Sequence, residues 1–90
     1  TTADNNVAVG KHAMRANTTG HSNVAVGKDA LLVNTTGVEN TAVGAIALDA
    51  NTTGGSNVAV GQAAMSSNTT GSNNSSCINW TYYLSVDCIN

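Results

Sequence analysis

Hydrophobic and polar positions repeat along this chain with a fixed 17-residue period. The apolar triplet at residues 7–9 returns three times at that step, each time preceded by an asparagine and followed by a glycine. The four copies occupy residues 6–10, 23–27, 40–44 and 57–61. A short fixed period of this kind is typical of a solenoid, in which each repeat buries its apolar side only against its neighbours.

The triplet alternates β-favouring valine with alanine, which predicts a short β-strand in each repeat. One face of the strand carries Val9 and its equivalents, and the other carries only Ala8 and its equivalents. A position that accepts nothing larger than alanine indicates close contact with another layer of backbone or with another subunit. The glycine after the strand suits a corner that other residues resist. We expect both columns to form a core ladder, made of Val9, Val26, Val43, Val60, Ala8, Ala25, Ala42 and Ala59.

A second apolar pair follows each strand, in a segment that we call the arm. It consists of alanine and then a long flexible side chain, as Ala13-Met14, Ala30-Leu31, Ala47-Leu48 and Ala64-Met65. The spacing of Gly10, Ala13 and Met14 fits one face of a helical turn. A straight stack favours a short strand or an irregular arm, because stacked strands lie about 4.8 Å apart and packed helices about 8–10 Å. Both conformations stay open at this point.

The polar block Asn-Thr-Thr-Gly closes each repeat at residues 17–20, 34–37, 51–54 and 68–71. Asparagine and glycine both tolerate left-handed backbone, so the block predicts a turn. Stacking aligns Asn17 with its equivalents into a ladder of hydrogen-bonded amides, and Asn6 with its equivalents into a second.

The same polar block has two other interpretations. The pattern Asn-x-Thr makes candidate glycosylation sites of Asn17, Asn34, Asn51, Asn68 and Asn79. Alternatively, the threonine columns that begin at Thr18 and Thr19 form a flat array for ice or a crystalline polysaccharide. Adjacent residues of an extended chain point to opposite faces, so each repeat offers only one outward threonine.

After residue 73 the repeat gives way to a short polar linker at residues 74–76 and a different C-terminal segment at residues 77–90. Apolar residues alternate with polar ones between Cys77 and Cys88, which predicts one long strand with a buried side. We expect this side to be an assembly strand that completes a neighbouring subunit. Its residues are Ile78, Trp80, Tyr82, Leu84 and Val86.

The two cysteines are the candidate disulfide residues. A straight strand separates Cys77 from Cys88 by on the order of 36 Å, whereas a disulfide needs Cα atoms within about 7 Å. We therefore expect pairing between chains. A tight turn at Tyr82-Tyr83 would instead allow local closure within one chain.

Composition excludes several classes of partner. Charged residues are 9% of the 90 and the net charge is -2, so no basic patch is available to neutralise nucleic-acid phosphates. No apolar run approaches the roughly 20 residues of a membrane span.

An even cysteine count in a small chain favours an oxidising compartment. The chain opens at Thr1 without an initiator methionine, which suggests a processed or excised product.

No constellation of residues supports catalysis. The five carboxylates occupy non-equivalent repeat positions, so stacking builds no carboxylate pair. His12 and His21 are distant in sequence from both cysteines, which argues against a zinc site. We expect no enzyme activity, no cofactor and no metal.

The Asn-(Val/Thr)-Ala-Val-Gly unit, followed by a small-residue arm and a polar glycine turn, resembles the head repeats of trimeric autotransporter adhesins. It also resembles the Asn-Thr-Thr-Gly repeats of bacterial surface proteins and phage tail-fibre-like proteins. The resemblance covers residues 6–73. It implies a parallel β-roll, often trimeric, with the Val-Ala-Val strand near the centre and the polar turn outside. The repeat here is longer by a few residues in the arm, and the cysteine-flanked segment has no counterpart there.

The expected fold is therefore all-β: a polar lead-in at residues 1–5 and a parallel β-solenoid (β-roll) of four 17-residue coils at residues 6–73, followed by the long C-terminal strand. Neither end shows a cap, so we expect self-association into a trimer or a filament. The expected function is that of a structural subunit of an extracellular fibre, on a cell or virion surface. The alternative is a carbohydrate- or surface-binding adhesin or tail-fibre module whose partners are glycans or a cell surface. It would use the variable residues Lys11, His12, Arg15 and His21.

Overall fold

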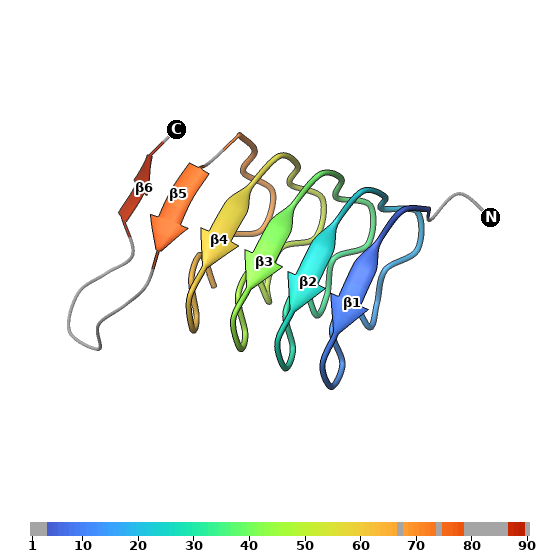
Figure 1. The fold of residues 1–90 in the computed structure, drawn as a ribbon. Helices are drawn as coiled ribbons and strands as arrows, with labels where there is room; N and C mark the ends of the chain where they lie inside the picture. Colours follow the sequence, from blue (N-terminus) through green and yellow to red (C-terminus); the bar gives the residue numbers. More distant parts are fainter. Residues whose placement is uncertain (1–3, 67, 74, 79–86, 90) are drawn as a thin grey trace.

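A computed structural model of the chain describes residues 4–66, 68–73, 75–78 and 87–89. Its six strands form one sheet in chain order (Figure 1), and the described residues contain no helix. The strands are β1 (Val7–Val9), β2 (Val24–Val26), β3 (Thr41–Val43), β4 (Val58–Val60), β5 (Ser75–Ile78) and β6 (Asp87–Ile89). The expected all-β class is confirmed.

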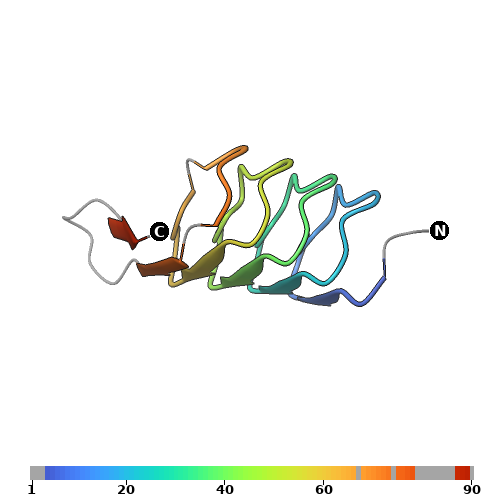
Figure 2. The same ribbon diagram turned by 90° about the horizontal axis from the view of Figure 1, so that it is seen from above.

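The first four strands are parallel and pair at the constant 17-residue step of the sequence repeat. Val7 pairs with Val24, and Ala25 pairs with Ala42. The third pairing, of β3 with β4, keeps the same step. Each repeat leaves the sheet, passes through the arm and the Asn-Thr-Thr-Gly turn, and returns beside its own start (Figure 2). The strand position and the period expected from the sequence are both confirmed.

The arm is a series of tight turns. The N–H groups of Ala13, Arg15 and Asn17 each donate to the carbonyl three residues before them, at 3.2, 3.0 and 3.1 Å. His12 and Met14 adopt left-handed backbone, with φ of 64° and 56°. The arm is therefore neither a helical turn nor a second short strand. Of the conformations left open by the sequence, only the irregular arm agrees with these turns.

Hydrogen bonds to the next repeat explain this conformation of the arm. The Met14 N–H donates to the Ala30 carbonyl at 2.9 Å, and the Asp29 N–H donates back to the Lys11 carbonyl at 2.9 Å. The turns thus leave backbone N–H and C=O groups free to bond to the arm of the next repeat. Successive arms are therefore as far apart as successive strands of the sheet.

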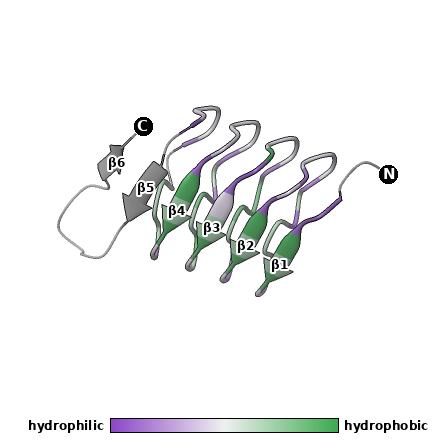
Figure 3. Ribbon diagram, turned by 45° about the horizontal axis from the view of Figure 1, so that its top comes forward, coloured by the Kyte–Doolittle hydropathy of each residue, from purple (hydrophilic) through white to green (hydrophobic). Residues whose placement is uncertain are grey.

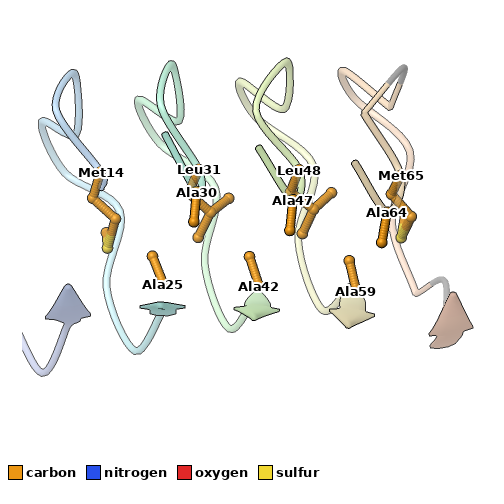
Figure 4. Close-up of a cluster of buried hydrophobic side chains, with 10 residues drawn as sticks. All are labelled: Met14, Ala25, Ala30, Leu31, Ala42, Ala47, Leu48, Ala59, Ala64 and Met65. Atoms are coloured by element: carbon orange, nitrogen blue, oxygen red, sulfur yellow. The ribbon is translucent and has the colours of Figure 1, made fainter. Parts of the chain in front are cut away.

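The core is a thin double layer between the sheet and the arm (Figure 4). Ala25, Ala42 and Ala59 line the inner side of the sheet and are completely buried. Opposite them the arm contributes Met14, Ala30, Leu31, Ala47, Leu48, Ala64 and Met65. The alanine half of the expected core ladder is confirmed for β2 to β4. Ala8 is exposed, since β1 has no strand on its other side within the described residues.

The valine half of the expected core ladder is wrong for a single chain. Val9, Val43 and Val60 are exposed on the outer side of the sheet, and Val26 is half-buried. Successive residues of a strand point to opposite sides, and the inner side is filled by alanines against the leucine and methionine layer. The valines therefore have to face outwards.

At the C-terminal end, β5 continues the sheet with its register shifted by one residue, since Ala59 pairs with Cys77 and not with Ser76. β6 then pairs antiparallel with β5, and Ile78 lies opposite Asp87. One straight strand over residues 77–88 is therefore wrong, because its two ends lie side by side. β5 also begins inside the segment expected to be a linker. The other expected assembly-strand residues, Trp80, Tyr82, Leu84 and Val86, lie outside the described residues.

The polar lead-in continues the repeat at its described residues. The Ser22 N–H donates to the Asp4 carbonyl at 3.0 Å, as the Glu39 N–H does to the His21 carbonyl at 3.1 Å. Asn5 has a φ of 62°, close to the 59° of Ser22. Asp4 and Asn5 thus take the positions that His21 and Ser22 take at the end of the first repeat.

Candidate assembly surfaces

Two asparagine ladders hold successive repeats together. The bonding between side-chain amides that the sequence predicts occurs in the first ladder, whereas in the second each side-chain oxygen accepts a backbone N–H of the next repeat. In the first, Asn34 Nδ2 donates to Asn17 Oδ1 at 3.0 Å. In the second, Asn23 Oδ1 accepts the backbone N–H of Asn40 at 2.9 Å. Both ladders meet at the Gly37 carbonyl, which accepts from Asn23 Nδ2 at 2.9 Å and from Asn34 Nδ2 at 3.2 Å. The ladders therefore satisfy these buried asparagine side chains within one chain.

The ladders contradict glycosylation at two of the candidate sites. Asn34 and Asn51 are completely buried, and the Nδ2 of each donates two hydrogen bonds. A glycan on either nitrogen is incompatible with this packing. Asn17 and Asn68 are half-buried and also donate through Nδ2. Asn79 lies outside the described residues.

The threonine turn is likewise occupied by contacts inside the stack. The N–H groups of Thr18, Thr19 and Gly20 converge on the Thr35 carbonyl at 3.0, 3.1 and 3.1 Å. The Thr18 hydroxyl donates to the same oxygen at 3.0 Å. The column that begins at Thr18 therefore binds the next repeat, and the exposed threonine row is the one that begins at Thr19.

The outer side of the sheet is an exposed apolar face, which we call the valine face. Its exposed side chains are Val7 (49%), Val9 (56%), Val43 (36%), Val58 (37%) and Val60 (40%). Figure 3 shows the hydrophobic strands in a row, with a pale start of β3 where Thr41 replaces valine. Large exposed apolar patches often mark interaction surfaces, which makes the valine face a candidate for one.

The four variable basic residues of the first repeat are all exposed. Lys11, His12 and Arg15 belong to the turns of one arm, whereas His21 follows the Asn-Thr-Thr-Gly turn. His12 Nδ1 lies 3.3 Å from Asp29 Oδ1. The arm therefore supplies a small polar surface on the opposite side of the core from the valine face.

The two cysteine positions lie across from each other on β5 and β6. Between the pairs Ser75–Ile89 and Ile78–Asp87, an irregularity sets Ser76 and Cys77 against Cys88. Neighbouring antiparallel strands bring Cα atoms to about 4.5–5.5 Å, so separation along the chain no longer argues against local closure. Pairing between chains and pairing within one chain both stay predictions.

Asp49 is the described carboxyl group with a clear shift in acidity. Burial raises the pKa of Asp49 above its ordinary 3.8, the charge of Asp29 adds to the rise, and backbone hydrogen bonds from Asp49 and Ala50 oppose it. Its Oδ1 is buried without a hydrogen-bond partner among the described residues. A raised pKa in the folded state means that this group favours folding at acidic pH and disfavours it as pH rises through the raised pKa.

We therefore expect Asp49→Asn to raise the free energy of unfolding at pH 7. The gain shrinks at about pH 3, below the ordinary Asp pKa of 3.8, because the wild-type carboxyl is then largely protonated in the folded and the unfolded state alike. Urea denaturation at both pH values measures the difference, with Asp4→Asn as a control at an exposed carboxyl. A loss of stability at pH 7, or the same gain at both pH values, would contradict this account.

Among residues 4–66, 68–73, 75–78 and 87–89, no three His, Cys, Asp or Glu side chains are grouped to hold a metal ion. No helix in this part of the chain has the length and apolarity of a membrane span. Comparisons with protein-family models, curated proteins and solved structures found no match. The candidate functional surfaces are thus the valine face and the exposed edge of β1, together with the arm of the first repeat.

Proposed function

We propose that the chain is a β-solenoid rod and serves as a structural subunit of an extracellular fibre. Each 17-residue repeat is one coil, and copies of the rod associate through their valine faces. The observation that carries the proposal is an apolar face that stays exposed, although the core between the sheet and the arm is already filled. Val9 is 56% exposed, whereas the core residues Leu31 and Leu48 are completely buried.

The chemistry of the valine face favours a second copy of the same chain as its partner. The strand positions 7–9, 24–26, 41–43 and 58–60 hold only valine, alanine and one threonine. No charge on this face repels an identical face, and two copies share the same spacing between strands, so their β-branched side chains can pack in register. A contact between two identical valine faces pairs rods side by side, and extension into a fibre then needs a second, end-to-end contact. The resemblance to trimeric adhesin heads, in which the same strand lies near the centre, also supports the proposal.

The alternative function is a surface-binding module. It is supported by the exposed Lys11, His12 and Arg15 on a single arm, which lies away from the proposed contact between copies. The two functions are compatible in one fibre, since they use different sides of the coil.

The test is the oligomeric state of Val9→Lys/Val43→Lys. We expect the wild-type chain to associate in a concentration-dependent manner and the double variant to sediment as a monomer, because charge on the face has to be desolvated to form the contact. The control is Thr19→Lys/Thr53→Lys, which places the same charges on the exposed threonine row. Circular dichroism of each variant checks that the β-structure is kept.

A wild-type chain that stays monomeric across a wide concentration range would overturn assembly through the valine face. Association that survives in the valine variant would do the same. Electron microscopy of the wild-type protein then distinguishes fibres from closed trimers.

A further inference from the structure

We infer that the open edge of β1 is a docking edge for a chain segment that carries the same 17-residue repeat, received in parallel and in register. The inference rests on the coil architecture proposed above and not on the fibre role or the valine face. The partner is defined chemically, by the hydrogen-bonding groups and the glycines that a repeat presents to the next one.

The first repeat exposes the surface that later repeats bury. β1 pairs with β2 alone in the described part of the chain. Ala8 is exposed, although the equivalent alanines of β2 to β4 are completely buried. Asn6 and Asn17 are half-buried, whereas the next residues of both ladders, Asn23 and Asn34, are completely buried. This edge has the composition of an interface, and no described residue pairs with it as a strand.

The contacts that would cover the edge occur repeatedly within the structure. The Asn23 N–H donates to Asn6 Oδ1 at 3.0 Å, and the Gly27 N–H donates to the Val9 carbonyl at 2.7 Å. One repeat later, the Asn40 N–H donates to Asn23 Oδ1 at 2.9 Å and the Gly44 N–H to the Val26 carbonyl at 2.7 Å. Successive repeats thus reproduce the same interface, bond for bond.

Moving this interface back by one repeat defines what the edge of β1 can bind. The Asn6 N–H faces the place of an incoming asparagine Oδ1, and the Gly10 N–H faces the place of an incoming valine carbonyl. Asn34 Nδ2 donates to Asn17 Oδ1 of the repeat before it. By the same relation, Asn17 Nδ2 can donate to the Oδ1 of an incoming asparagine. The incoming segment therefore needs both asparagines of the repeat, at their 11-residue spacing.

The start of the described chain already has the path of such a segment. The Asp4 carbonyl accepts the Ser22 N–H at 3.0 Å, and Asn5 has the left-handed φ of its equivalents. A segment joined ahead of Asp4 is consequently delivered in the parallel direction and at the correct position. The other end of the sheet differs, because β6 runs antiparallel to β5 and does not continue the parallel register.

Glycines make the edge selective. A Cβ on Gly27 would lie 2.6 Å from the carbonyl carbon of Gly44, and a Cβ on Gly37 would lie 2.5 Å from the carbonyl oxygen of Gly54. A repeat with glycine at both positions therefore fits against the next one without any shift of the backbone. A segment with side chains at those positions fits less closely, which distinguishes this edge from the unpaired edge of an ordinary strand.

The test adds one repeat in cis, so that docking does not depend on concentration. A copy of residues 38–54 replaces residues 1–3, which places the copied Gly54 directly before Asp4. One matched control has Gly44→Ala in the copy alone. A second control has the copied residues in scrambled order. Thermal unfolding and amide hydrogen exchange are measured for all three and for the wild-type chain.

We expect the in-register copy to raise the Tm by about 5 °C or more, the shift that roughly 1 kcal/mol produces in a chain of this length. Exchange of the Ala8 and Gly10 amides is expected to slow at least about tenfold, which corresponds to about 1.4 kcal/mol of added protection. Neither control is expected to produce these changes.

Protection that is equal for the in-register and scrambled copies would overturn the inference. So would the absence of protection at Ala8 and Gly10 while the Ala25 and Gly27 amides stay protected, and in that case the coil architecture stands. Rapid exchange at Ala25 and Gly27 as well would overturn the coil architecture and the docking edge together.

Discussion

Gly44→Ala is expected to abolish cooperative folding of the chain. Gly44 has a φ of 130°, and a Cβ there would lie 2.6 Å from the carbonyl carbon and oxygen of Gly61. Both contacts are with backbone of the next repeat, so relief requires the repeats to separate. Backbone strain of about 1–3 kcal/mol adds to that separation. The sum is comparable with the whole stability of a small domain, about 5–15 kcal/mol. Far-ultraviolet circular dichroism during heating measures the loss of the transition.

Gly55→Ala is the matched control for this prediction. The nearest atom to a Cβ on Gly55 is the Val38 carbonyl oxygen, at 3.1 Å. Equivalent positions hold His21 and Val38, so the backbone there accepts a side chain. We expect Gly55→Ala to change the free energy of unfolding by no more than about 0.5 kcal/mol, as most surface substitutions do. Similar transitions for the two alanine variants would contradict the proposed contact between glycines of successive repeats.

Asn23→Ala is expected to lower the free energy of unfolding by about 2–4 kcal/mol. The substitution removes the acceptor of the buried Asn40 N–H and one of the two donors to the Gly37 carbonyl. A buried donor left without a partner costs about 1–3 kcal/mol, and the lost side chain adds a small cavity. Urea denaturation monitored by circular dichroism measures the change.

Asn6→Ala removes the same two bonds at the end of the same ladder. Asn6 Oδ1 accepts the Asn23 N–H, and its Nδ2 donates to the Gly20 carbonyl. Asn6 is only half-buried, so water can replace much of the lost hydrogen bonding. We therefore expect the free energy of unfolding to fall by about 1 kcal/mol. Equal losses for Asn6→Ala and Asn23→Ala would show that burial of the ladder is not the source of its stability.

Repetition made much of this fold predictable from the sequence. Four copies of one unit act as an internal alignment, in which the invariant Ala25 and Asn34 positions stand out from variable ones such as Lys28 and Leu32. A constant 17-residue step then implies parallel strands in register, since equivalent residues have to lie beside one another. The strands and both asparagine ladders follow directly from that step.

The inner and outer sides of the strand were not predictable in the same way. Val9 and Ala8 belong to columns that are equally invariant, and invariance does not distinguish a core position from a contact between subunits. The leucines of the arm decide the matter, because Leu31 and Leu48 fill the interior and leave room only for alanine opposite. This match between large side chains on the arm and small ones on the strand can be seen only when the two segments are known to face each other.

The conformation of the arm was also hidden from the sequence. Ile46 and Leu48 have φ of 56° and 51°, a region that branched and bulky side chains normally avoid. No local residue preference predicts left-handed backbone there. It is enforced by bonds between repeats, such as that of the Leu48 N–H to the Ala64 carbonyl at 2.9 Å.

The C-terminal segment shows the limit of alternation as a signal. The period-2 pattern predicted one strand between Cys77 and Cys88, and the structure has strands at its two ends, where β5 ends and β6 begins. Alternation indicates which side of a sheet a residue faces, and it does not reveal where a chain reverses direction. The register also shifts by one residue at β5, where Cys77 and not Ser76 takes the place beside Ala59. The valine face and the edge of β1 could be placed only after the strands were assembled.

The left-handed residues have a consequence for how the chain folds. Three residues without a glycine's freedom adopt positive φ in the second repeat, at Asp29, Leu31 and Glu39. At about 1–2 kcal/mol each, the strain reaches about 3–6 kcal/mol per repeat, and only a neighbouring repeat offsets it. Folding of a single repeat is therefore unfavourable in free energy, and each further repeat adds favourably once two repeats have paired. We expect slow nucleation by the first pair of repeats, followed by fast addition of the others onto repeats that are already folded.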